Sequence, residues 1–233
     1  TLRGKTTLTS VVLPSSVLII QNYAFYGCTG LTSINIPQSV MAIGHYAFFG
    51  CMSLTSADLP ASVELIGNYA FVSCYGMINV DSGNQYYSSI DGVLYNKQQT
   101  TLIQCPTSKT GVFYFPFKVT SIGEYAFYNS ALSVISYTSS SLISIGDYAC
   151  AYSYGLYAFS IPPSVTSIGK YAFYECSYLQ RISCGNDTPV NLISSENVFG
   201  GVDKSVCKLY IPGGSYDLYV AADQWKDFAN IIV

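Results

Sequence analysis

A period of 23 residues constrains this chain more than any other feature. Residues 31–53 read LTSINIPQSVMAIGHYAFFGCMS, and residues 54–76 read LTSADLPASVELIGNYAFVSCYG. The two blocks share a proline, an Ile-Gly pair, an Ala-Phe pair and a cysteine at the same offsets. A fixed period of this length is typical of a solenoid, in which each repeat forms one coil.

The segment Ile-Gly-x-Tyr-Ala-Phe traces the period along the chain. Its tyrosine recurs as Tyr23, Tyr46, Tyr69, Tyr125, Tyr148 and Tyr171. The steps are 23 residues, except for one step of 56, which is two periods plus ten residues. The spacing predicts a single solenoid domain over residues 1–233, with one coil that carries an insertion.

Each coil begins with a strand pattern, such as Leu31, Ile34 and Ile36. A proline then ends the strand, because proline cannot donate to a sheet ladder. We expect Gly44 to permit a tight turn, and Tyr-Ala-Phe-x-x-Cys to form one helical turn with Ala and Phe pointing inward. The pattern therefore predicts an α/β-type repeat solenoid of short strands and helical turns, in which stacked coils bury a continuous core.

The insertion occupies about residues 81–116. Ile90–Tyr95 and Thr101–Cys105 are β-like runs around Asn96–Gln99, and they predict a β-hairpin that protrudes from one coil. Two interpretations remain open for it: a tolerated insertion without a role, or a finger that binds a ligand.

The C-terminal residues, about 207–233, predict a cap. A last strand is followed by Gly-Gly, which breaks the period. Ser215 is a good helix N-cap for a short helix from Tyr216 to Ala222. Trp225 and Phe228 are expected to seal the last coil.

Composition excludes several classes of protein. Half of the residues are hydrophobic, 10% are charged, and the net charge of −3 includes 10 scattered basic residues. The chain has no basic stripe for a nucleic acid, and no apolar run of the ~20 residues that a membrane span needs. The first residues correspond to the middle of a coil, so we expect further coils, or a signal and an anchor, upstream.

The repeat resembles a known family. The pattern L-x-x-I-x-I-P-x-x-V-x-x-I-G-x-Y-A-F-x-x-C, in which x is any residue, is similar to the BspA-type leucine-rich repeat. The matching residues of one coil are Leu31, Ile34, Ile36, Pro37, Val40, Ile43, Gly44, Ala47, Phe48 and Cys51. Coil 132–155 departs from the pattern, with Ser139 in place of proline and Cys150 in place of phenylalanine, so the pattern does not predict its packing.

The resemblance implies a right-handed, curved solenoid of a bacterial protein that is secreted or attached to the cell surface. It also implies adhesion to host matrix proteins or to other cells, and it supplies no catalytic residues. The insert 91–97 and the ending 209–228 also look like features of this family's proteins in anaerobic gut and oral bacteria.

The residue types that usually carry chemistry are interpreted as structural. Cys28, Cys51 and Cys74 share one repeat position, where a buried thiol packs well, although neighbouring coils also allow a disulfide. His45 occupies a variable, solvent-facing position, and no CxxC spacing suggests a metal. Asp58, Glu64 and Asp81 are the carboxylates whose convergence in space would suggest a glycosidase site. We therefore expect no enzyme activity, cofactor or metal.

The tyrosine position is the best candidate for binding a partner. Its six residues are either a structural stack at the coil edge or an exposed ladder that contacts protein or sugar, since tyrosine gives a large contact area at a low entropy cost. A polar concave face is expected beside it. Its residues are Thr32, Ser33, Asn35, Thr55, Ser56 and Asp58.

Three hypotheses of function remain open. The first is a cell-surface or secreted module that binds a host-matrix or cell-surface protein. The second is an architectural spacer that presents another domain. The third is a carbohydrate-binding module or enzyme, which would need clustered carboxylates among exposed tyrosines. No nucleic acid partner and no membrane insertion are expected in any of them.

Overall fold

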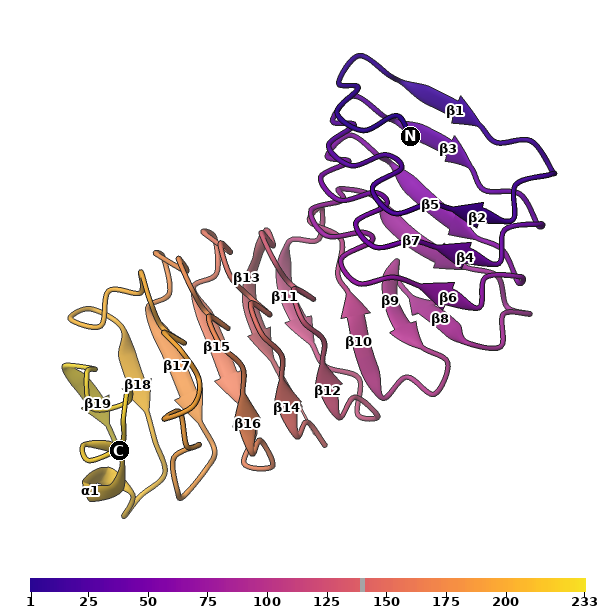
Figure 1. The fold of residues 1–233 in the computed structure, drawn as a ribbon. Helices are drawn as coiled ribbons and strands as arrows, with labels where there is room; N and C mark the ends of the chain where they lie inside the picture. Colours follow the sequence, from indigo (N-terminus) through magenta and orange to yellow (C-terminus); the bar gives the residue numbers. More distant parts are fainter. Residues whose placement is uncertain (139–140) are drawn as a thin grey trace. The chain divides into compact units, whose positions relative to one another are not determined.

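The computed structural model describes residues 1–138 and 141–233, so Ser139, where the repeat expects proline, lies outside the described residues. The chain forms two compact units, Thr1–Ser108 and Lys109–Val233. In each unit, short strands of consecutive coils stack in parallel ladders (Figure 1). Paired residues such as Ser10 and Ser33 are 23 positions apart, which makes each unit a β-solenoid with the predicted period.

The first unit contains ten strands in its described residues. They are β1 (Ser10–Val12), β2 (Ile19–Ile20), β3 (Ser33–Asn35), β4 (Ala42–Ile43), β5 (Ser56–Leu59), β6 (Leu65–Ile66), β7 (Met77–Val80), β8 (Tyr87–Ile90), β9 (Val93–Asn96) and β10 (Thr101–Gln104). β1 pairs with β3, β5 pairs with β7, and β2, β4 and β6 form a second ladder, all in parallel.

The second unit repeats this plan. Its elements are β11 (Gly111–Tyr114), β12 (Ser121–Ile122), β13 (Leu132–Ser136), β14 (Ser144–Ile145), β15 (Ala158–Ile161), β16 (Ser167–Ile168), β17 (Arg181–Cys184), β18 (Lys208–Tyr210), α1 (Tyr216–Tyr219) and β19 (Asn230–Ile232). The parallel order β11-β13-β15-β17-β18-β19 makes the larger ladder, and β12, β14 and β16 make the smaller one.

The core runs along each unit as columns of identical positions. Phe25, Phe48 and Phe71 are buried and stack with 5.2 Å between successive ring centroids. Each buried phenylalanine of this kind contributes roughly 2–3 kcal/mol of hydrophobic stabilisation. One coil cannot cover such a ring alone, so the next coil supplies the contact.

The departure at Cys150 leaves this column without a ring between Phe127 and Phe173. Strand residues fill the space. Phe159 lies edge-on to Phe173 at 4.8 Å, and Phe115 lies edge-on to Phe127 at 6.2 Å. The aromatic packing is therefore rebuilt from the strand side of the coil.

The predicted helical turn in each coil is wrong. The Tyr-Ala-Phe-x-x-Cys segments are turns, and α1 is the only α-helix among the described residues. All six repeat tyrosines have φ between 52° and 62°, which is the left-handed region of backbone conformation that residues other than glycine rarely adopt. An α-helix cannot contain such a residue.

The turn that contains the tyrosine with positive φ has an alternating pattern of hydrogen bonds. The N–H groups of Tyr23, Phe25 and Gly27 donate forward to carbonyls of the next coil, at 2.8–2.9 Å. The intervening N–H groups of Ala24 and Tyr26 donate within their own turn. Every second amide thus bonds the next coil, as in a sheet, although the segment is a turn.

The glycine before the tyrosine has a different role from the predicted one. Gly44, Gly67, Gly146 and Gly169 do not have positive φ, so they are not required by a tight turn. Instead, a Cβ atom at Gly67 would lie 2.4 Å from the backbone nitrogen of His45 in the preceding coil. The glycine recurs because the coils approach each other too closely for a side chain.

The insertion differs from the predicted protruding hairpin. β8 and β9 pair in antiparallel fashion around Asp91 and Gly92, whose φ values of 49° and 76° are typical of a type I′ turn. β9 then pairs in antiparallel fashion with β10, so the two runs assigned to a hairpin do pair, as part of a three-stranded meander. Ile90 and Tyr95 therefore belong to different strands. β9 is almost fully buried, and Leu94 joins the core of the unit, so the meander is packed and not a finger.

The C-terminal segment closes the second unit with aromatic side chains. Tyr219, Trp225 and Phe228 are buried, and the Trp225 ring lies 5.0 Å from that of Phe199. Trp225 Nε1 donates to the Val190 carbonyl at 2.9 Å. The helix here is shorter than expected, and the Ser215 side chain makes no capping hydrogen bond.

We expect Gly67→Ala to lower the free energy of unfolding by about 1–3 kcal/mol, the usual cost of overpacking. The new Cβ meets backbone atoms of the preceding coil, which cannot rotate away. Gly155→Ala is the matched control, since no atom lies within 4 Å of that Cβ position. Denaturant unfolding measures both. Equal free energies for the two variants would contradict the close-approach explanation.

Substitutions at Tyr46 distinguish a left-handed turn from a helix. Tyr46→Gly and Tyr46→Ala both remove the ring, but only glycine relieves the positive φ, so the glycine variant is expected to be more stable by about 1 kcal/mol. In a helical turn the order would be reversed by a similar amount. Thermal and denaturant unfolding of the pair give the sign directly.

Candidate functional site

The six repeat tyrosines form two stacks, one in each unit. In the first, Tyr23 and Tyr46 have ring centroids 5.0 Å apart, and Tyr46 and Tyr69 are 4.8 Å apart. In the second, Tyr125, Tyr148 and Tyr171 follow at 4.8 and 4.9 Å. The structure therefore brings the predicted residues together as two tyrosine ladders of three rings each.

The stacking determines what each ladder presents to solvent. Most ring faces are covered by the next ring, and apart from Tyr23, which is 37% exposed, the rings are half-buried. Ring edges and hydroxyls remain outside. A hydrogen bond to the Glu196 carboxylate raises the pKa of the Tyr171 hydroxyl from 10.0 to about 12.

A second aromatic row runs beside each ladder. Tyr26 stacks on Phe49 at 5.2 Å, and the Arg3 guanidinium lies 4.9 Å from the Tyr26 ring and 5.2 Å from that of Tyr23. In the second unit this row consists of Tyr128, Tyr152 and Tyr174. The aromatic surface is thus two rings wide.

The His45 position forms a ladder of side-chain hydrogen bonds between coils. The Asn22 Oδ1 atom accepts the His45 N–H at 2.8 Å, and His45 Nδ1 accepts the Asn68 N–H at 3.0 Å. Asp147 accepts the Lys170 N–H in the same way. Asn22, His45 and Asp147 thus each use a side-chain acceptor to bond the backbone of the next coil.

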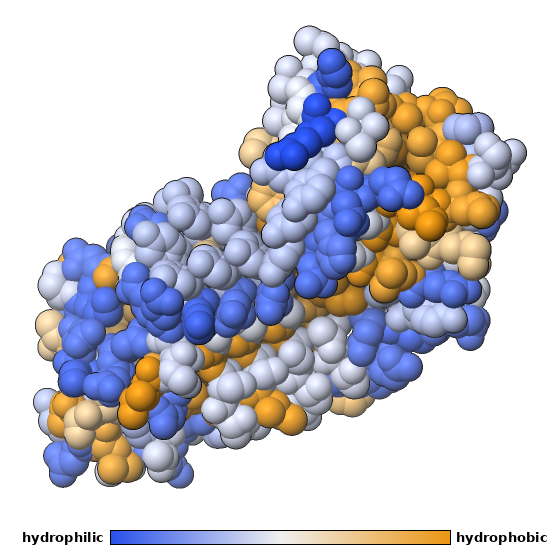
Figure 2. All heavy atoms as spheres, viewed as in Figure 1, coloured by the Kyte–Doolittle hydropathy of each residue, from blue (hydrophilic) through white to orange (hydrophobic). Residues whose placement is uncertain are grey.

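Sequence reasoning missed an apolar strip on the first unit. Figure 2 shows hydrophobic surface gathered over β2, β4 and β6. We define the apolar strip as Leu18, Ile19, Met41 and Leu65, which are 46–61% exposed. The signal was present, because Leu18 and Met41 occupy an outward repeat position that holds Thr120 and Thr166 in the second unit.

A groove of about 290 Å³ lies on the strand face of the first unit. Its lining includes Asp58, Asn79 and Asp81, but not Glu64. Asp58 Oδ1 accepts the Asn79 amide at 2.7 Å, and Asp81 Oδ1 accepts the N–H of Gly83 at 2.8 Å. Two of the three predicted carboxylates share the groove, and each is held by a hydrogen bond.

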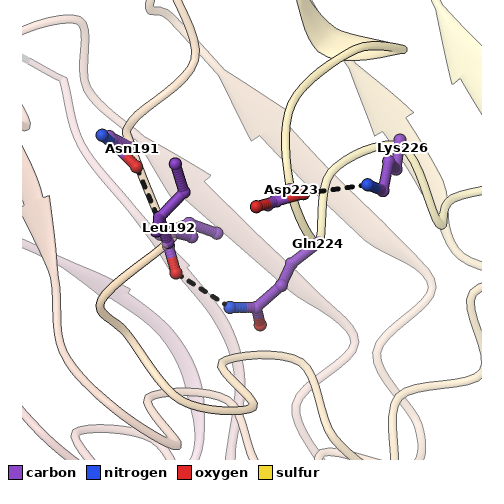
Figure 3. Close-up of polar contacts among 6 residues, drawn as sticks. Asn191, Leu192, Asp223, Gln224 and Lys226 are labelled. Atoms are coloured by element: carbon purple, nitrogen blue, oxygen red, sulfur yellow. Dashed lines mark hydrogen bonds and ion pairs between the residues drawn. The ribbon is translucent and has the colours of Figure 1, made fainter.

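A second groove, of about 270 Å³, lies between Pro189–Ile193 and Ala221–Asp223. Gln224 fastens its two sides together, as Figure 3 shows in part: its Nε2 donates to the carbonyls of Leu192 and Ser195, at 3.2 and 2.5 Å. Its Oε1 accepts the Val198 N–H at 2.7 Å. These contacts explain the groove as part of the closure of the last coil.

Several of the cysteines are held as hydrogen-bond donors. All eight cysteines are buried. Cys51 Sγ donates to the Phe25 carbonyl of the preceding coil at 3.2 Å, and Cys74 and Cys176 repeat this bond. Ser153 Oγ does the same at 2.9 Å. Serine can therefore replace cysteine at this position because both donate to the same kind of carbonyl.

Burial favours the protonated form of five of these thiols. It raises the pKa of Cys176, Cys184 and Cys207 to about 12, and it also raises the pKa of Cys28 and Cys74. A thiol must be deprotonated to ligate a metal or attack a substrate. Among residues 1–138 and 141–233, no group of three His, Cys, Asp or Glu side chains is arranged to hold a metal ion.

The part of the chain that the structure describes contains no helix long and apolar enough to cross a lipid bilayer.

A family model described as the BspA type leucine rich repeat region matches the chain in six copies, over residues 3–112 and 104–213. This match confirms the resemblance inferred from the repeat. No functionally curated protein matches the chain in sequence.

Three solved structures are similar in fold. The pneumococcal vaccine antigen PcpA has a TM-score of 0.67 and 22% identity, over 97% of this chain and 68% of that one. A leucine rich cell surface protein of Faecalibacterium prausnitzii A2-165 has a TM-score of 0.62 and 24% identity, over 91% and 62%. A leucine-rich repeat protein of Eubacterium ventriosum ATCC 27560 has a TM-score of 0.57 and 21% identity, over 97% and 72%. At these identities the likeness shows the fold.

The buried thiols predict how stability depends on pH. The folded pKa of Cys176, about 12, lies above its ordinary value of 9.0. Its contribution to stability is therefore fully present below pH 9 and is lost as the pH rises toward 12. Denaturant unfolding across this range is expected to show a falling free energy, with at most about 1.4 kcal/mol per pH unit from each such thiol.

Cys176→Ser is the control for this pH dependence. Its hydroxyl is expected to keep the hydrogen bond to the preceding coil, as Ser153 does, but it does not titrate. The variant should show a shallower fall of stability with pH. Identical slopes in the two proteins would contradict the assignment to this thiol.

Proposed function

Because the chain belongs to the BspA-type leucine-rich repeat family, we propose that it is a non-enzymatic protein-interaction module that acts at a cell surface or after secretion. The partner we expect is a host-matrix protein or a protein on another cell. The Faecalibacterium prausnitzii relative is itself described as a cell surface protein, which supports this location.

The apolar strip is the observation that carries the proposal. Soluble proteins rarely leave a contiguous apolar patch uncovered, and patches of this kind mark sites of protein interaction. Leu18, Met41 and Leu65 project outward from consecutive coils, each at least 46% exposed. An architectural spacer would need no such surface, and a polar sugar would gain little from it.

The tyrosine ladders are the second candidate face. Their outward ring edges and hydroxyls suit a protein surface, since tyrosine is enriched at the centres of interfaces. Their stacked geometry also supports a purely structural role, so the two faces require separate variants.

The test is a binding screen of the 233-residue chain against immobilised extracellular-matrix proteins and host cells. Met41→Ser with Leu65→Ser removes the centre of the apolar strip, and it is expected to weaken binding about tenfold or more. Ile143→Ser is the matched control, because Ile143 is an isolated exposed residue at the position equivalent to Met41. Melting temperatures of all variants are expected to match the parent.

A separate pair examines the tyrosine ladder. Tyr46→Asn with Tyr69→Asn removes two rings, and asparagine suits the backbone because Asn197 occupies the same repeat position with a φ of 47°. Loss of binding in this pair alone would move the interface to the ladder. Failure of every protein and cell surface to bind the chain would contradict the proposed function.

A further inference from the structure

The strand face of the second unit carries an unusual arrangement of charge. In β11, β13, β15, β17, β18 and β19, the only charged residues are Arg181 and Lys208. They are paired across the β17–β18 ladder, so they are neighbours on adjacent strands. Both are exposed. A chain with a net charge of −3 thus presents a purely basic pair at one place on a sheet.

The guanidinium of Arg181 is held in a fixed orientation. It lies 4.2 Å from the centroid of the Tyr210 ring, which belongs to the adjacent strand. Its Nε donates to Ser183 Oγ at 3.2 Å. Stacking and this hydrogen bond together position the planar group without the help of a carboxylate. Among the described residues, no acceptor bonds the two terminal nitrogens of the guanidinium.

Two exposed tyrosines lie at the start of these strands. Tyr157 and Tyr178, which lie just before β15 and β17, are 42% and 54% exposed, with ring centroids 6.2 Å apart. The Arg181 N–H donates to the Tyr157 carbonyl at 3.1 Å, so these tyrosines lie near the backbone of Arg181, whereas its guanidinium lies against Ser183 and Tyr210. Arginine and tyrosine are the residues most often found at the energetic centres of protein interfaces.

We infer that Arg181, stacked on Tyr210 with Lys208 beside it, is a docking site for a carboxylate side chain of an acidic segment in a protein partner. A fixed guanidinium with free terminal nitrogens matches the two oxygens of a carboxylate, and Lys208 adds a second positive charge. The exposed Tyr157 and Tyr178 at the start of the strands suit a protein segment that carries apolar or aromatic residues next to its acid. The inference rests on the proposed interaction function and names the chemistry of a partner site.

The test measures fluorescence anisotropy with the 233-residue chain. The probes are a short synthetic peptide of alternating Glu and Tyr, its Gln-Tyr counterpart, and an oligogalacturonate that presents carboxylates on sugar. The Glu-Tyr peptide is expected to bind saturably, about tenfold more tightly than the Gln-Tyr peptide, and more weakly as ionic strength rises.

Variants locate the binding. Arg181→Ala and Arg181→Lys are each expected to weaken binding of the Glu-Tyr peptide about tenfold or more, since lysine keeps the charge but not the planar fork. Lys170→Ala is the matched control, because it removes another single exposed charge of the same unit. It is expected to bind as the parent does, and all melting temperatures are expected to stay unchanged.

Several results would overturn the inference. They are equal binding of the two peptides, unchanged binding of the Arg181→Ala or Arg181→Lys variant, no saturable binding of the acidic peptide, and binding of the oligogalacturonate alone. The proposed function is tested separately. If a matrix protein binds the Arg181→Ala variant as tightly as the parent, this site is contradicted but the interaction module is supported. If the acidic peptide binds but no matrix protein or cell surface does, the site is supported but the proposed function is contradicted.

Discussion

The structure depends on hydrogen bonds between identical positions of consecutive coils. Strands of the regular coils pair with an offset of 23 residues, and the turns on the opposite side of the coil use every second amide for the same purpose. Coils must then approach closely enough for backbone to meet backbone. This close approach of the coils explains the glycine before five of the six repeat tyrosines, the inward alanine, and the side-chain acceptors at the His45 position. Hydrophobic columns fill the interior that the ladders enclose. Their burial stabilises a geometry that the backbone hydrogen bonds determine.

Much of the fold was predictable because the same pattern of residues recurs in several coils. Strands, inward columns and the period follow from Leu31, Ile36 and Phe48 and their counterparts, since alternation and recurrence report burial directly. The turn was misread because tyrosine in a Tyr-Ala-Phe context resembles a helix former. Nothing in its chemistry reveals a positive φ, which is imposed by the neighbouring coils. The meander, by contrast, was predictable from the sequence, because Asp91-Gly92 is a strong local signal for a two-residue turn. The prediction of a single strand over Ile90–Tyr95 overlooked this signal.

The candidate sites were less predictable than the fold. The tyrosine ladder was visible as a recurring residue, but the distance of about 5 Å between rings, which decides how much of each face remains free, depends on coil spacing. Arg181 was only one of ten scattered basic residues in the sequence. Its orientation over Tyr210 depends on a partner 29 positions further along the chain, and 29 is not the period of the repeat. A repeat pattern predicts the positions that recur, so it does not predict a site that depends on a departure from the repeat.

The hydrogen bonds between coils run in both directions. Turn amides such as that of Phe25 donate to the following coil, while thiols such as that of Cys51 donate to the preceding one. Each boundary between coils is therefore made of the same donors and acceptors as the next. Removing or duplicating one whole coil would leave every boundary chemically complete, whereas losing a single residue would put all later positions out of phase. The architecture can thus change its length in evolution by whole repeats without a new interface, and the outward positions of each added coil are free to acquire a different surface.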